Sequence, residues 1–186
     1  MAGMANGMYL HGGILPYVAT FFVFSDYLKH GTRLSALMKL PVIYVMTHDS
    51  IGVGEDGPTH EPIEQLAGIR SMPDTYMWRP ADSKETAAAY EFALTKAEGP
   101  VVMALSRQKL PLYEETGKAA LKGGYILKDC EGTPELILIG TGSEHAQFVF
   151  LGVHGHGVDA EVVARAEDTH RDLAAVGGKD LVENFF

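Results

Sequence analysis

Short apolar segments alternate with amphipathic ones along the first part of the chain. Runs rich in β-branched and aromatic residues predict strands, and apolar residues spaced three or four positions apart predict helices. The expected strands are 17–24, 41–47, 75–79 and 100–105, and the expected helices are 2–10, 26–39, 62–71 and 84–98. This alternation predicts an α/β fold, a parallel sheet with helices on both faces.

Residues at the helix starts agree with this interpretation. Serine, threonine and aspartate commonly cap helix N-termini, and proline is favoured at the first helical position. We expect Ser25 or Asp26 to cap the second helix, Pro62 to open the third, and Asp82 or Ser83 to cap the fourth.

The pattern changes after residue 110. Residues 111–123 are rich in turn-forming and charged residues, which is typical of a linker. Beyond it, the pattern predicts strands at 124–128, 135–140 and 159–164, and a turn into a helix at 140–144. We therefore expect a first domain at 1–110, a linker at 111–123 and a partial second α/β unit at 124–186.

Composition narrows the possible environments and partners. The chain has 186 residues and a net charge of −9, which disfavours a nucleic-acid surface but permits small anionic substrates. The single cysteine, Cys130, excludes an internal disulfide and suits a reducing compartment. There is no apolar run of about 18 residues and no basic secretory leader, so we expect a cytoplasmic chain without membrane contact.

A glycine-rich polar loop follows the apolar run at 41–46. Residues 47–62 contain His48, Asp56 and His60 among several glycines and prolines. Imidazoles transfer protons and bind hydroxyl or phosphate oxygens, and carboxylates accept hydrogen bonds from sugar hydroxyls. Open α/β sheets bind ligands at the carboxyl ends of their strands, so this loop is our first candidate for a functional site.

Two other interpretations of the loop are weaker. Gly52, Gly54 and Gly57 match the spacing of a dinucleotide fingerprint, but residues 58–61 separate them from the next predicted helix. The fingerprint requires a helix to begin at the glycines, so we disfavour a dinucleotide site. The two histidines are twelve residues apart without rigid ligand spacing, so we assign no metal ligands.

Aromatic and basic residues near other strand ends have two possible roles. Phe21, Phe22, Phe24 and Tyr27 form either part of the core or a stacking pocket for a flat heteroaromatic ring. Arg107 follows the strand at 100–105, where an arginine either holds a phosphate or forms a surface salt bridge.

The segment from His48 to Glu64 closely resembles the central segment of transketolases. These thiamine-diphosphate enzymes of the pentose phosphate pathway transfer two-carbon ketol units between sugar phosphates. Further similarity lies at 1–7, 20–27, 79–82, 105–108 and 141–144. Deoxyxylulose-phosphate synthase and the pyruvate dehydrogenase β subunit share the fold, but His48-Asp49-Ser50 and Leu105-Ser106-Arg107-Gln108 favour transketolase. The resemblance covers residues 1–143 and implies a pyrimidine-binding domain followed by the start of a C-terminal domain.

The resemblance also implies a cofactor and a ring pocket. Thiamine diphosphate would perform the carbon–carbon cleavage, with its aminopyrimidine ring lined by Phe21, Phe24 and Tyr27. The diphosphate and its Mg or Ca ion would be held by a domain outside this sequence. In the family, a glutamate that pairs with the aminopyrimidine ring lies just before the segment equivalent to Met1, so this sequence does not include it.

Four polar residues receive substrate roles from the same resemblance. His60 would face the reacting carbons of the donor and assist proton transfer, and Asp56 would bind a sugar hydroxyl. His48 and Arg107 would hold the sugar phosphate, so that His48 and His60 form the catalytic pair.

These implications lead to an expectation about assembly. We expect a homodimer or a complementing chain that carries the diphosphate site, with little turnover by the isolated chain. One alternative is a non-catalytic binding or regulatory module, or a truncated remnant that dimerises without turnover. Another is a self-sufficient enzyme in which Glu55, Glu61 or Glu64 replaces the missing glutamate.

Overall fold

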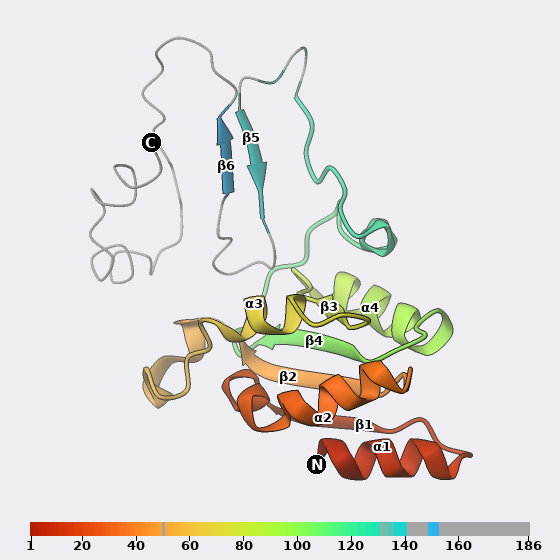
Figure 1. Ribbon diagram of the computed structural model, residues 1–186. Helices are drawn as coiled ribbons and strands as arrows, with labels where there is room; N and C mark the ends of the chain where they lie inside the picture. Colours follow the sequence, from red (N-terminus) through yellow and green to blue (C-terminus); the bar gives the residue numbers. More distant parts are fainter. Residues whose placement is uncertain (50, 131, 133, 135, 141–148, 153–186) are drawn as a thin grey trace. The chain divides into compact units, whose positions relative to one another are not determined.

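The computed structural model describes residues 1–49, 51–130, 132, 134, 136–140 and 149–152. A four-stranded sheet forms its centre, and all the neighbouring strands in it are parallel (Figure 1). In spatial order the strands are β1 (Tyr17–Phe21), β2 (Ile43–Asp49), β4 (Val101–Ser106) and β3 (Tyr76–Trp78). The predicted parallel α/β fold is confirmed.

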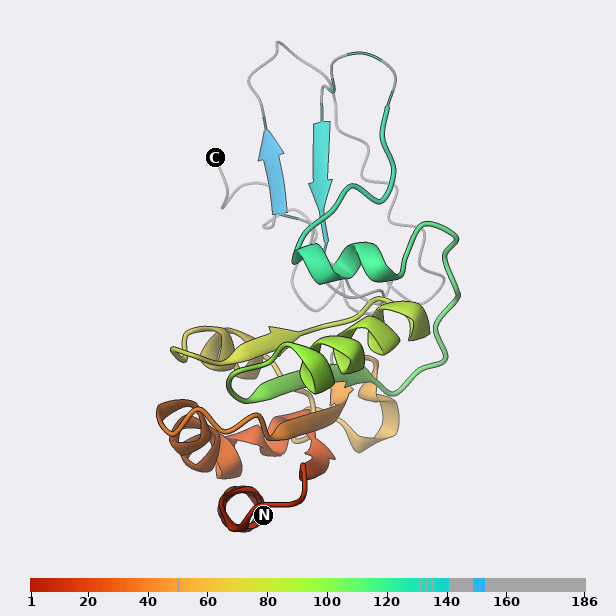
Figure 2. The ribbon, with the colours of Figure 1, turned by 90° about the vertical axis from the view of Figure 1, so that its right-hand side faces the viewer.

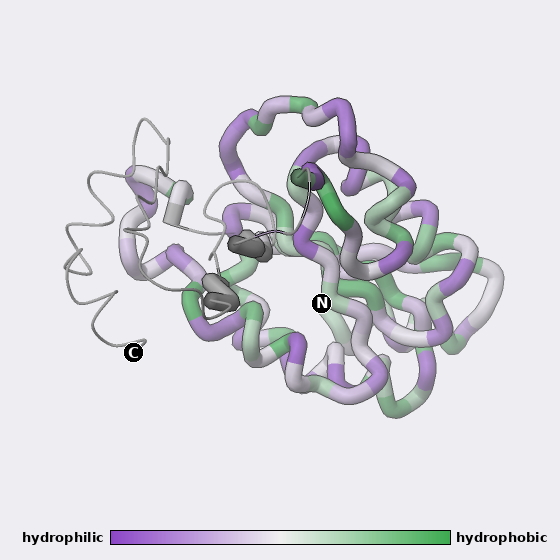
Figure 3. The backbone as a smooth tube through the Cα atoms, turned by 90° about the horizontal axis from the view of Figure 1, so that it is seen from above, coloured by the Kyte–Doolittle hydropathy of each residue, from purple (hydrophilic) through white to green (hydrophobic). Residues whose placement is uncertain are grey.

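Helices cover both faces of the sheet (Figure 2). Three of them pack with the first face: α1 (Ala2–His11), α2 (Ser25–Leu37) and α3 (Gln65–Arg70). The other face packs against α4 (Ser83–Thr95). Hydrophobic and hydrophilic residues alternate along much of the chain (Figure 3), as amphipathic elements between core and solvent require.

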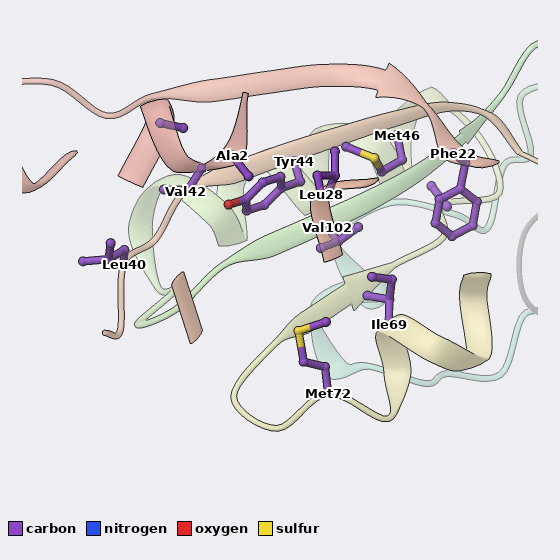
Figure 4. Packing of buried hydrophobic residues seen from close by; sticks show 12 residues of the cluster. Ala2, Phe22, Leu28, Leu40, Val42, Tyr44, Met46, Ile69, Met72 and Val102 are labelled. Atoms are coloured by element: carbon purple, nitrogen blue, oxygen red, sulfur yellow. The ribbon is translucent and has the colours of Figure 1, made fainter. Parts of the chain in front are cut away.

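The two buried cores follow from the alternation of side chains along β2. Tyr44 and Met46 of β2, with Val42 just before the strand, lie on the first face, where Figure 4 shows them packed with Leu28 of α2 and Ile69 of α3. Their neighbours Ile43 and Val45 lie on the second face with Ala89 and Ala93 of α4. Because both faces are buried, β2 is apolar from Ile43 to Met46, as expected for a central parallel strand.

A buried polar cluster joins α1, α2 and β2. The Ser35 hydroxyl lies 2.7 Å from both Asn6 Oδ1 and the Tyr44 hydroxyl, and Asn6 Nδ2 donates to the Gly31 carbonyl at 3.0 Å. Gly31 allows this close approach, since a Cβ there would lie 2.5 Å from the Cβ of Ala2. Interior polar groups need such partners, so the cluster fixes how α1 sits against α2.

Several predicted boundaries are wrong. The N-cap of α2 is Phe24, so neither Ser25 nor Asp26 caps it. Helix α3 begins at Gln65 rather than at Pro62. The strand from Tyr17 ends at Phe21, and a 3₁₀ turn at Phe22–Phe24 follows because the chain bends into α2. The predicted Asp82 cap is confirmed, since its carboxylate accepts a hydrogen bond from the Glu85 N–H at 3.0 Å.

The region after β4 also differs in part from expectation. No strand forms at residues 124–128, and a 3₁₀ helix occupies Lys118–Lys122 within the predicted linker. The predicted strand at 135–140 corresponds to β5 (Leu136–Ile139), which pairs antiparallel with β6 (Val149–Gly152). The predictions at 141–144 and 159–164 lie outside the described residues. Among the described helices, none is long and apolar enough to span a bilayer.

Candidate active site at the carboxyl end of β2

Strand β2 ends in a bulge centred on His48. Met46 pairs with Ala104 and Asp49 with Ser106, so Thr47 and His48 together oppose the single residue Leu105. His48 has a φ of 58°, a left-handed conformation that costs a non-glycine residue about 1–3 kcal/mol. Bulges re-aim side chains and are frequent beside active sites. The sequence pattern gave no sign of this extra residue.

The bulge places the His48 ring against Phe21 of the neighbouring strand. The two ring centroids lie 3.6 Å apart with planes 15° apart, a stacked arrangement. His48 Nδ1 also lies 3.0 Å from the Thr47 hydroxyl, which donates to the Thr20 carbonyl at 3.4 Å. These contacts engage one face and one edge of the imidazole and leave Nε2 on the opposite edge.

His60 joins the same aromatic group from the far end of the glycine loop. Its ring contacts Phe24 edge-on with centroids 5.4 Å apart, and Phe21 edge-on at 6.2 Å. Its Nδ1 lies 2.8 Å from the Thr59 hydroxyl. Tyr27 completes the group, 6.0 Å from Phe24 and 86 % exposed. The structure therefore brings together five of the residues selected from the sequence: Phe21, Phe24, Tyr27, His48 and His60.

Arg107 contacts the glycine loop rather than these rings. One guanidinium nitrogen donates to the Val53 carbonyl at 2.6 Å, and the other lies 3.7 Å from the Glu55 carboxylate. Gly54, with a φ of 79°, sits directly beside this guanidinium. Asp56, in the same loop, has an exposed side chain. Arg107 and Asp56 thus border the loop, and in the described part of the chain neither side chain contacts the rings of His48 and His60.

Gln108 packs under the loop at Gly52. A Cβ on Gly52 would lie 1.3 Å from Nε2 of the Gln108 side chain, so a larger residue here would require that side chain to move. The Gln108 Oε1 atom is buried and has no hydrogen-bond partner among the described residues. The glycine at position 52 is thus explained by close packing. The dinucleotide interpretation is unsupported, because the next helix begins only at Gln65, well past Gly57.

A buried ion pair lies directly behind the bulge. Arg79, which follows β3, donates from Nε to Asp49 Oδ2 at 2.5 Å, and Asp49 is only 5 % exposed. Arg70, at the end of α3, lies close to both Asp49 and Arg79. Burial and the charge of Arg79 lower the pKa of the Arg70 guanidinium, and the charge of Asp49 partly offsets this lowering. Sequence reasoning missed this group, because nothing in the local pattern links residues 49, 70 and 79.

Comparison with known proteins decides the family. Residues 1–112 match the family described as transketolase, pyrimidine binding domain. The chain belongs to the transketolase family. A chloroplastic transketolase of Solanum tuberosum is 57 % identical over 148 residues, which cover 77 % of this chain and 20 % of that protein. The chain thus spans about a fifth of the length of the curated relatives it matches.

Solved structures give the same family and fold. The transketolase of Campylobacter jejuni is 47 % identical with a TM-score of 0.64, over 70 % of this chain and 21 % of that one. A split-gene transketolase, solved as an inactive beta4 tetramer, is 32 % identical with a TM-score of 0.51, over 60 % of this chain and 35 % of that one. The resemblance noted in the sequence is confirmed, including the pyrimidine-binding fold.

Proposed function

We propose that this chain supplies the aminopyrimidine and sugar-phosphate side of a transketolase active site. The reaction is transfer of a two-carbon ketol unit between sugar phosphates with thiamine diphosphate. The observation that carries the proposal is the convergence of His48 and His60 on the aromatic residues Phe21 and Phe24 at the end of β2. The family relationship supports the same assignment.

The aromatic residues suit a flat heteroaromatic ring. Phe21 and Phe24 are half-buried, and their ring planes lie within 19° of parallel. Tyr27 lies at the edge of the group and exposes most of its side chain. Aromatic faces of this kind stack on heterocycles and keep water away from one side of them. Bound thiamine diphosphate supplies the electron sink for carbon–carbon cleavage, while the protein binds and orients the cofactor and the substrate.

The two histidines act on the substrate in this proposal. Each imidazole is held through Nδ1 by a neighbouring threonine hydroxyl, which leaves Nε2 as the atom that meets the substrate. His60 moves a proton at the reacting carbons of the donor, and His48 contacts the sugar phosphate through Nε2. Arg107 pairs with the phosphate once its guanidinium turns from Glu55, and Asp56 accepts from a sugar hydroxyl.

The proposal extends to assembly and setting. The diphosphate and its Mg or Ca ion are held by another domain, provided by a second copy or by a complementing chain. Residues 1–110 form the pyrimidine-binding domain, 111–123 the linker, and 124–186 the start of a C-terminal-like domain. The proposed setting is the pentose phosphate pathway of the cytoplasm, without nucleic-acid or membrane partners.

A non-catalytic role is the second candidate. A binding or regulatory module that dimerises without turnover is the main competitor, since the family match at residues 1–112 is to the pyrimidine binding domain. The two candidates differ in whether residues 1–112 can complete a working site.

A chimera separates the two candidates. Residues 1–112 replace the matching segment of the Campylobacter jejuni transketolase, and ketol transfer from xylulose 5-phosphate to ribose 5-phosphate is measured with thiamine diphosphate and Mg. We expect kcat within about a hundredfold of the host enzyme, because misplacement by an ångström costs up to about that factor. A chimera that folds and assembles like the host but shows no transfer would support the non-catalytic candidate.

A further inference from the structure

The buried pair of Asp49 and Arg79 takes no part in the function proposed above, yet Asp49 directly follows His48. We infer that this ion pair is a positioning device for His48, which keeps the bulged end of β2 in the conformation that stacks the imidazole on Phe21. The inference rests on the proposed function in one respect: there, the positioned His48 contacts the sugar phosphate.

The backbone at His48 is strained. A left-handed φ of 58° persists in a non-glycine residue only where the surroundings hold it. On one side the ring is held by Phe21 at 3.6 Å. On the other side the chain continues at once into Asp49, whose carboxylate is buried against Arg79.

The register of β2 against β4 connects the strain at His48 to Asp49. The bulge gives β2 one residue more than β4 between the Met46–Ala104 and Asp49–Ser106 pairs. Slipping the strand by one residue to relax His48 would also move Asp49 to the other face of the sheet. That movement would leave Arg79 without this carboxylate in a buried site, so the ion pair opposes the relaxed register.

Arg79 comes from a part of the sheet that does not pair with β2 directly. It follows β3, which pairs with β4, while Asp49 ends β2 on the other side of β4. The ion pair thus ties the ends of β2 and β3 together across the strand between them. Two charges so placed fix the strand end more tightly than backbone pairing alone, which the bulge interrupts.

The test uses the ring current of Phe21 as a reporter. Histidine ring protons stacked on a phenyl ring resonate upfield, so the carbon-bound ring protons of His48 mark the stack in NMR spectra of the 186-residue chain. We expect Asp49→Asn to move these signals most of the way to the shifts of the exposed His30. Methyl signals of Val42 and Met46 report whether the core is intact.

Two further variants keep the test decisive. Glu91→Gln removes the carboxylate charge from the exposed Lys118–Glu91 pair and should leave the His48 signals in place. Arg79→Lys keeps the buried charge but loses the planar guanidinium, and it replaces Asp49→Asn if that variant does not fold. Unchanged His48 shifts in a folded Asp49→Asn or Arg79→Lys chain would overturn the inference.

Kinetics of the chimera then separate this inference from the proposed function. Asp49→Asn should raise KM for xylulose 5-phosphate severalfold, and this effect should vanish when His48→Ala is already present. Displaced His48 signals without any change in KM would support the positioning role and contradict the assignment of His48 to the sugar phosphate.

Discussion

Phe21 and His48 lie face to face across the β1–β2 pair, with ring centroids 3.6 Å apart and ring planes 15° apart. Phe21 pairs in register with Thr47, so it is the bulge at His48 that carries the imidazole over the phenyl ring. Phe21, which the resemblance suggests for cofactor binding, thus also supports His48, the proposed contact of the sugar phosphate.

Replacing Phe21 should weaken substrate binding by the chimera. The Phe21→Leu variant keeps an apolar side chain but loses the stack, which is worth about 0.5–1.5 kcal/mol. We expect KM for xylulose 5-phosphate to rise about three- to tenfold, since about 1.4 kcal/mol corresponds to a factor of ten. Phe92→Leu is the matched control, because that ring contacts Tyr76 and Trp78 instead. Equal KM values for the two variants would contradict a supporting role for Phe21.

A pair of glycine substitutions tests the packing of α1 on α2. Gly31→Ala places a methyl group 2.5 Å from the Cβ of Ala2 and near the backbone of α1, so we expect a loss of about 1–3 kcal/mol in unfolding free energy. Gly7→Ala meets nothing within 4 Å. It should gain up to about 1 kcal/mol from helix propensity. Urea denaturation of both variants measures the difference, and stabilisation by both would show that the helices do not pack as described.

The stability of the chain should depend on the charge of Asp82. This carboxylate is 2 % exposed, caps α4 and accepts from Thr116 Oγ1 at 2.5 Å and from the Tyr113 N–H at 3.2 Å. Burial alone would raise its pKa, but these hydrogen bonds and those from the backbone of Glu85 and Lys84 outweigh burial, so the pKa lies below its ordinary value. The ionised Asp82 therefore contributes fully to the free energy of unfolding above about pH 4, which is the pKa of an aspartate in the unfolded chain. This contribution is lost as the pH falls through the lower pKa of the folded state.

Asp82→Asn should accordingly cost about 1–3 kcal/mol of unfolding free energy at pH 7, with the deficit shrinking below pH 4. Urea denaturation from pH 7 down to pH 3 follows this change. Glu98→Gln, at an exposed position, is the control and should show no comparable loss. A deficit for Asp82→Asn that stays constant over the whole range would contradict a native hydrogen-bonded carboxylate.

The sequence predicted those parts of the fold that depend on local patterns. Apolar runs such as 41–46 marked the buried strands, and Asp82 marked the start of α4. Register could not be predicted in this way, because the extra residue at His48 is visible only from the pairing of β2 with β4. Contacts between distant residues, such as Asp49 with Arg79 and Gly52 with Gln108, likewise depend on how the strands are placed side by side.

The candidate site was likewise predicted only in part from the sequence. Family resemblance selected Phe21, Phe24, Tyr27, His48 and His60, and the structure places them in one aromatic group. The grouping follows from topology, since β1 and β2 are adjacent and the glycine loop returns toward α2. Arg107 and Asp56 border the loop instead, and their roles stay predictions because they depend on a bound sugar phosphate.

The central claim is that the chain contributes catalytic groups, and His60 tests it most directly. We would measure kcat/KM for ketol transfer by the chimera carrying His60→Ala and, in parallel, His30→Ala, an exposed histidine on α2. Loss of a proton-transfer group costs about 10²–10⁴-fold, so kcat/KM should fall by that factor for His60→Ala and stay unchanged for His30→Ala. Equal activity of the two variants would contradict the assignment of His60 to the reacting centre.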